Sequence, residues 1–148
     1  MGKFRFKIIL MALVFTLAVP YYAFAEISEN DVPEPEIIVV EPETIEPYGA
    51  GVWDPIDTQK LTLYYAFARS TKTLSTGGGD FKVKVTSLNH PSNTVYITPV
   101  VNGTPLTMTP VPLINGTREM IIRDIPKGQV YFLCRTSMDD TIDFEFFD

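Results

Sequence analysis

The sequence predicts an all-β fold, a single antiparallel β-sandwich of about seven strands. After residue 57, apolar and polar residues alternate along short runs rich in β-branched and aromatic residues, which is typical of half-buried strands. The Asn-Gly pairs at 102–103 and 115–116 suit the tight type I′ turns that join antiparallel strands. A small β-barrel is the alternative, because strand pattern alone does not separate two packed sheets from one closed sheet.

Each expected strand follows from this alternation. In the first run every second residue from Leu61 to Phe67 is apolar or aromatic, and in the sixth Val130, Phe132 and Cys134 share one face. The glycine-rich residues 75–79 are expected to form a flexible connection. The predicted strands span residues 59–68, 80–88, 94–101, 104–109, 117–124, 129–136 and 141–147.

The first 25 residues are typical of a Sec-type secretory signal peptide. Lys3, Arg5 and Lys7 precede an uncharged apolar run of twelve residues, and a small-x-small pattern ends at Ala25, where we expect cleavage. The run is shorter than the about 20 apolar residues that span a bilayer, so we expect no integral membrane segment in the mature chain. The protein is therefore expected to be secreted or held at the cell envelope. Its single cysteine, which allows no internal disulfide, favours a bacterial source.

Residues 26–57 form an acidic, proline-rich segment between this signal peptide and the domain expected at 58–148. The segment holds ten acidic residues, no basic residue and five prolines, a composition that predicts an extended, disordered spacer. It also contains one β-prone run flanked by glutamates. This run is either part of the spacer or a strand that adds to a sheet edge, in its own chain or in a partner. Its residues are Ile37, Ile38, Val39 and Val40.

Charge and chemistry exclude several classes of protein. Removal of residues 1–25 leaves nine basic against 18 acidic side chains, a formal charge of −9 that argues against a nucleic-acid binder. The only histidine, His90, lies in a predicted loop without a matching nucleophile, and Cys134 is expected to be buried in a strand. We therefore predict neither an enzyme nor a cofactor or metal requirement.

Two sets of side chains remain as candidate binding residues. Tyr64, Tyr96 and Tyr131 each lie opposite the main apolar face of their run, so they are expected to be exposed, where aromatic rings stack on sugars or grip a protein. The alternative is that tyrosine is simply favoured in strands. The acidic cluster near the C-terminus is a weak calcium candidate, with a solvated face as the alternative. Its residues are Asp139, Asp140 and Asp143, followed by Glu145.

The function that fits these features is an exported, non-enzymatic module for binding or interaction, at the cell envelope or outside the cell. Its partner would be an extracellular or cell-wall protein or carbohydrate. The alternative is a structural or assembly subunit that self-associates through the Ile37–Val40 run. A small secreted enzyme is the third and least favoured class.

Overall fold

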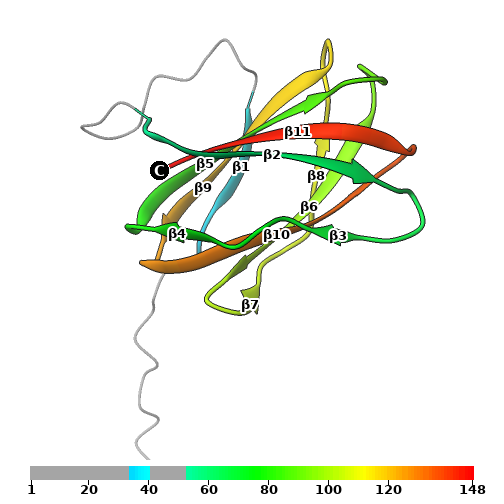
Figure 1. Cartoon of the computed structure of the whole chain (residues 1–148). Coiled ribbons are helices and arrows are strands. Elements are labelled where there is room, and N and C mark those ends of the chain that lie inside the picture. Colours follow the sequence, from blue (N-terminus) through cyan, green and yellow to red (C-terminus); the bar gives the residue numbers. More distant parts are fainter. Residues whose placement is uncertain (1–33, 41–52) are drawn as a thin grey trace, which may run out of the picture. The chain divides into compact units, whose positions relative to one another are not determined.

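The structure is a computed structural model that describes residues 34–40 and 53–148. These residues form eleven strands in two antiparallel sheets, and no helix occurs among them (Figure 1). Neither sheet closes on itself, so the predicted β-sandwich is confirmed and the barrel alternative is excluded. The predicted signal peptide and most of the predicted spacer lie outside the described residues. The described part of the chain contains no helix long and apolar enough to cross a membrane.

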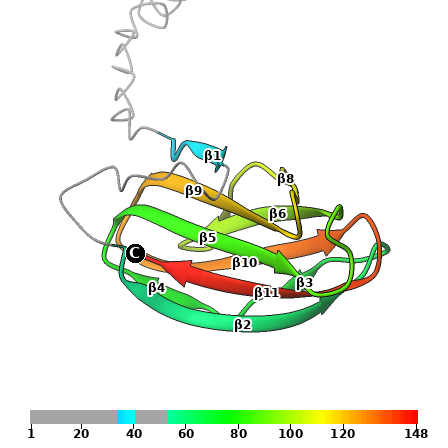
Figure 2. The same cartoon turned by 90° about the horizontal axis from the view of Figure 1, so that it is seen from above.

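The first sheet, called sheet A, has five strands. β1 pairs with β9 at one edge, and β2 pairs with β11 at the other edge. β1 and the first residues of β2 come from the segment that the sequence assigns to the spacer. Figure 2 shows the strands in the order β1 (Ile37–Val40), β9 (Thr117–Ile125), β5 (Gly79–Ser87), β11 (Asp140–Phe147) and β2 (Pro55–Leu63).

The second sheet, called sheet B, is built around two long central strands. β10 (Gly128–Thr136) pairs with β6 (Thr94–Val101) over seven residues. Short strands flank this pair on both sides, so each edge is made of two pieces. They are β3 (Arg69–Ser70) and β4 (Leu74–Thr76) beside β10, and β7 (Thr104–Pro105) and β8 (Thr109–Pro112) beside β6.

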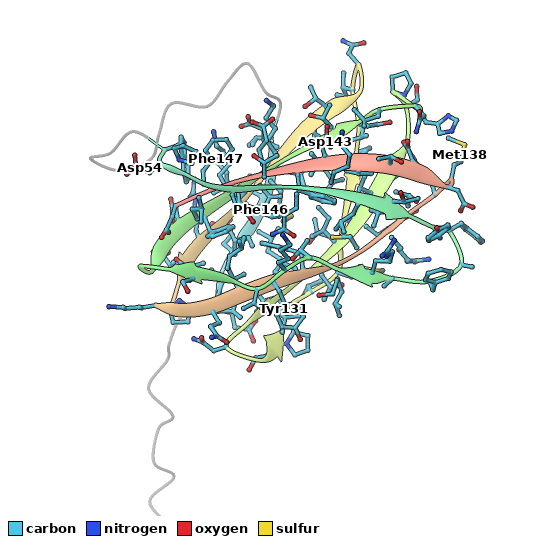
Figure 3. All side chains as sticks on the ribbon, viewed as in Figure 1. Asp54, Tyr131, Met138, Asp143, Phe146 and Phe147 are labelled. Carbon is cyan, nitrogen blue, oxygen red and sulfur yellow. The ribbon has the colours of Figure 1, made fainter. Side chains whose placement is uncertain are left out.

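Phenylalanine rings fill the space between the two sheets. Phe81, Phe132, Phe144 and Phe146 have no exposed surface, and Figure 3 shows Phe146 in the interior. The rings of Phe132, from sheet B, and Phe146, from sheet A, stack with their centroids 5.4 Å apart. Burial of one such ring contributes about 1.5–3 kcal/mol, so this layer accounts for a large part of the stability.

The turn chemistry read from the sequence is confirmed at both Asn-Gly pairs. Asn102 and Gly103 have φ angles of 50° and 84°, and Asn115 and Gly116 have 52° and 85°. Positive φ at both central positions defines the type I′ turn, which matches the right-handed twist of the strands.

The prediction that the first strand reaches residue 68 is wrong. β2 ends at Leu63, and Tyr65 and Phe67 lie in the following loop with 65% and 56% of their surface exposed. The backbone N–H of Tyr65 donates to Asp139 Oδ1 at 2.9 Å, so the chain turns away from sheet A and enters sheet B at β3. Alternation alone cannot show this crossing, since a loop is able to continue the same residue pattern.

Two further predictions need correction in sheet B. Residues 104–109 are not one strand, because the chain leaves β6 between β7 and β8. Pro99 explains the break: it lacks a backbone N–H, and its carbonyl accepts from Leu106 on this same side of β6. Part of the predicted connection at 75–79 belongs to β4 and to the start of β5. Strands of two or three residues are too short to show a period.

The single tryptophan is docked on the outer face of sheet A. The ammonium nitrogen of Lys82 lies 5.1 Å from the centroid of the Trp53 ring and 4.5 Å from that of Phe147. The same nitrogen is 3.7 Å from Glu119 Oε2. Trp53, the first residue of the second described segment, therefore covers the nearly buried side chain of Lys82.

Gly128 is expected to be the glycine at which substitution by alanine lowers the unfolding free energy most. Its φ of 153° is rare for other residues, and an added Cβ would collide with the Asn102 side chain, whose Oδ1 accepts from the Gln129 N–H at 2.8 Å. Gly79, with φ of 108° and no atom within 4 Å of an added Cβ, is the matched control. We expect Gly79→Ala to cost about 1 kcal/mol of unfolding free energy and Gly128→Ala about 2 kcal/mol more. Urea unfolding followed by circular dichroism measures both, and equal losses would contradict the collision.

Candidate functional site

The outer face of sheet A carries charges that are paired with one another. Its outward side chains alternate in sign across neighbouring strands, so cations meet carboxylates directly or diagonally. The charges on this face therefore largely satisfy one another. The ion pairs are Lys60–Asp143 at 3.6 Å, Lys82–Glu119 at 3.7 Å and Lys84–Glu145 at 2.8 Å.

The outer face of sheet B holds two of the three predicted tyrosines. Tyr96 on β6 and Tyr131 on β10 are half-buried, and Figure 3 shows Tyr131 on this side of the molecule. In the register, Tyr96 lies opposite Arg135 and Tyr131 lies opposite Val100, so the tyrosines are four residues, or about 13 Å, apart along the strands. The Arg135 guanidinium lies 4.7 Å from the centroid of the Tyr96 ring and covers part of it.

The third predicted residue, Tyr64, lies elsewhere. It follows β2 in the loop to β3, and its ring stacks on Phe67 with centroids 4.8 Å apart. Its carbonyl oxygen accepts from the Thr136 N–H at 3.4 Å. The structure therefore places Tyr96 and Tyr131 on one sheet face and assigns Tyr64 to one end of the sandwich.

Four loops meet at this end, here called the loop end. They are residues 64–68, 88–93, 113–116 and 137–139, which follow β2, β5, β8 and β10. Of the seven exposed large apolar side chains in the described residues, five belong to these loops, with 44% to 65% of their surface exposed. They are Tyr65, Phe67, Leu88, Ile114 and Met138, the last labelled in Figure 3.

The loop end carries almost no charge. Apart from His90, Asp139 is the only ionisable acidic or basic side chain in the four loops, and it accepts a hydrogen bond from the Tyr65 N–H. The described turns at the opposite end, residues 77–78, 102–103 and 126–127, contain no exposed large apolar side chain. Because large exposed apolar patches are uncommon on a monomer, this asymmetry makes the loop end the candidate site.

A buried polar network forms the base of the loop end. Asp140 is only 3% exposed, and its carboxylate accepts from Ser87 Oγ at 2.5 Å, Asn89 Nδ2 at 2.9 Å and Asn93 Nδ2 at 3.1 Å. Asn93 has no exposed surface; its amide also donates to the Met138 carbonyl at 3.0 Å, and its Oδ1 accepts from Ser137 Oγ at 2.6 Å. The network thus joins the loops after β5 and β10.

Backbone hydrogen bonds tie the other loops to this base. The Gly116 N–H donates to the Pro91 carbonyl at 2.9 Å, which links the loop after β8 to the loop after β5. The His90 N–H donates to Ser87 Oγ at 2.8 Å, and the Tyr65 N–H reaches Asp139 in the loop after β10. The apolar side chains therefore stand on a connected and largely satisfied scaffold.

The titration of Asp140 reflects this scaffold. Burial by itself raises the pKa of the carboxyl group. Hydrogen bonds from the side chains of Ser87, Asn93 and Asn89 and from the Thr141 N–H stabilise the carboxylate and outweigh burial, so the pKa lies below its ordinary value.

The three calcium candidates point to different partners. Asp139 accepts from Tyr65, Asp140 is the centre of the buried network, and Asp143 pairs with Lys60. No group of three or more His, Cys, Asp or Glu side chains able to hold a metal occurs within residues 34–40 and 53–148.

The two residues considered for catalysis lie in different surroundings. Cys134 is fully buried on the inner face of β10, which it shares with Val130 and Phe132, as predicted, and burial raises the pKa of its thiol. His90 is exposed in the loop after β5.

Sequence reasoning missed most of the loop end. Leu88, Ile114 and Met138 stand singly among polar residues, so no period marks them. Asn93 is the residue for which a signal existed, because an asparagine directly before a strand and next to a proline-containing loop is a frequent hydrogen-bonding centre.

Asp140→Asn tests the network. The amide offers an N–H₂ group to donors and lacks the charge, so we expect a loss of about 2–4 kcal/mol in unfolding free energy at pH 7. The folded-state pKa of Asp140 is lowered. Its contribution is therefore present above the unfolded value of about 3.9 and is lost as pH falls through the folded value.

The stability difference between the two chains should therefore shrink in acid, which urea unfolding at pH 7 and at successively lower pH would show. Asp139→Asn is the control, because an amide oxygen still accepts from the Tyr65 N–H. A constant difference at every pH would contradict the assignment of the charge to Asp140.

Comparison with other proteins adds no relative to this description. No model of a known protein family matches the chain. No curated protein matches it either.

Proposed function

We propose that this chain is an exported, non-catalytic β-sandwich module that binds a partner through its loop end, at the cell envelope or outside the cell. The observation that carries the proposal is the gathering of five exposed apolar side chains on four separate loops at that end. The export step is supported by the basic start, the apolar run and the small-x-small pattern of the first 25 residues.

The base of the loop end favours tight binding. A contact surface loses affinity when its loops must be ordered on binding, and a surface held in place beforehand avoids that cost. Asp140 and Asn93 hold the loops after β5 and β10 together, and Gly116 joins the loop after β8 to them. The apolar side chains are thus presented by a framework formed before any partner arrives.

The chemistry of the loop end favours a protein partner over a carbohydrate. Leu88, Ile114 and Met138 offer apolar contact without hydrogen-bonding groups, and methionine and aromatic residues are enriched in protein interfaces. Sugars, in contrast, need planar rings together with polar groups. Tyr96 and Tyr131 on sheet B supply rings, but both are half-buried and one is covered by Arg135.

A non-catalytic role is supported by the positions of the reactive side chains. Cys134 is buried with a raised pKa, and His90 is exposed with its backbone, not its ring, engaged by Ser87. Within the part of the chain that the structure describes, neither side chain has the partners that a nucleophile and its base require.

The proposal is tested by binding of the fluorescently labelled chain to envelope fractions of the producing cells. We expect Phe67→Ser combined with Met138→Ser to weaken binding at least tenfold, since about 1.4 kcal/mol of lost apolar contact suffices for that factor. Both residues are exposed, so the fold should lose no more than the about 0.5–1.5 kcal/mol that the Tyr64–Phe67 stacking contributes.

The matched control changes the outer face of sheet B. Tyr131→Ala combined with Leu133→Ser alters a similar apolar area on a different surface and should leave binding within about twofold. Unchanged binding of the Phe67/Met138 variant would overturn the proposal. Loss of binding only in the Tyr131/Leu133 variant would overturn it as well and move the contact to sheet B.

A further inference from the structure

β1 is an edge strand held by one neighbour. Its four residues pair antiparallel with β9, from Ile37 opposite Ile122 to Val40 opposite Glu119. Ile37 and Val39 pack against the core, while Ile38 faces outward beside Ile121, which is 4% exposed. Without β1, the apolar middle of β9 would be an unpaired sheet edge, which is a template for another strand.

Two polar contacts fix the register of this pairing. The Arg123 N–H donates to the Glu36 carbonyl at 2.8 Å. The Arg123 guanidinium lies 3.6 Å from the Glu36 carboxylate. The β9 edge therefore recognises an extended strand with a glutamate followed by apolar residues that alternate inward and outward.

The connection after β1 leaves the choice of acceptor open. β1 and β2 are the two edges of sheet A, four strand spacings or about 19 Å apart. Fourteen Cα–Cα steps separate Val40 from Asp54, and they reach about 46 Å when extended. A chain of this length allows β1 to pair with β9 of its own molecule or with β9 of a neighbour.

We infer that the β9 edge is a strand-exchange site whose partner is a second copy of this chain, each copy donating its Ile37–Val40 strand to the other. Exchange keeps every contact that β1 makes, so the two arrangements differ mainly in the cost of association. A strand joined to its acceptor by a short linker has an effective concentration in the millimolar range. Exchange therefore becomes important as the local concentration of the protein approaches about 1 mM, as at a crowded surface. The inference does not depend on the loop end.

Single-cysteine variants of the full chain test the exchange. Glu36 and Arg123 are in contact across the pairing, and 66% and 31% of their side chains are exposed, so a short bismaleimide should link cysteines at these positions. The native Cys134 thiol is buried with a raised pKa and should not react in the folded protein. A chain carrying both substitutions should be linked within itself, which verifies the register.

Glu36→Cys and Arg123→Cys chains of different mass are then refolded together at about 1 mM and at about 10 µM. We expect a cross-linked heterodimer that is abundant at the high concentration and scarce at the low one. Thr58→Cys, on the outer face of β2 at the far edge of sheet A, replaces Arg123→Cys in the control. A mixture that yields no more heterodimer than this control at the high concentration would overturn the inference.

A shortened connection provides a second test. Deletion of residues 42–51 leaves four Cα–Cα steps between Val40 and Asp54, a reach of about 14 Å that is less than the about 19 Å across sheet A. Pairing within one chain is then excluded, so light scattering should show a dimer. Val39→Lys in the shortened chain should return it to a monomer, because it places a charge against the core. A monomeric shortened chain without that substitution would overturn the inference.

Discussion

The layer of phenylalanine rings between the sheets is the contact on which the other features depend. Phe81 and Phe146 from sheet A meet Phe132 from sheet B, Phe144 stacks on Phe146, and stacking of Phe132 on Phe146 joins the two halves directly. Each of these side chains is one of an alternating set, so their burial fixes which residues face outward on β5, β10 and β11, and the pairing registers extend this to the neighbouring strands. The outward positions of the paired charges on sheet A and of the tyrosines on sheet B follow from the burial of the opposite face. The burial of these rings does not determine which side chains the loops at the ends of the strands expose.

Both ends of the sandwich contain an Asn-Gly turn, but they differ in what supports their loops. At one end Asn102 and Gly103 adopt positive φ, and the Asn102 side chain accepts from the Gln129 N–H. At the loop end, where Asn115 and Gly116 adopt the same geometry, Asp140 and Asn93 also satisfy groups from two loops in a buried position. A buried carboxylate with several donors rigidifies its surroundings, and a glycine turn needs no such support. This base explains how loops that expose apolar side chains keep one conformation.

The alternation of residues made most of the sandwich predictable. The strands around Val83, Phe132 and Phe144 were found within one or two residues of their ends, since one face of each is buried. The first strand was extended wrongly because Phe67 continues the alternation in a loop; the residue that turns the chain is Asp139, which lies 74 positions from its bonding partner. The candidate site was hard to predict for the same reason. Tyrosines on strands carry a period, whereas a loop end is assembled from segments far apart in sequence that no spacing connects.

The edge of sheet A and the loop end are separate surfaces, and this separation has a consequence for binding. The network under the loop end is built from residues 87–140 of one chain, and the strand that pairs with β9 contributes nothing to it. Two copies that exchange β1 would therefore each keep an intact loop end. Such a pair would present two apolar contact surfaces on one assembly, and linked sites gain avidity of about 10²–10⁴ over a single site when both reach the partner. Strand exchange at the edge of sheet A would then strengthen binding at the loop end without any change in the contacts made by the loop end.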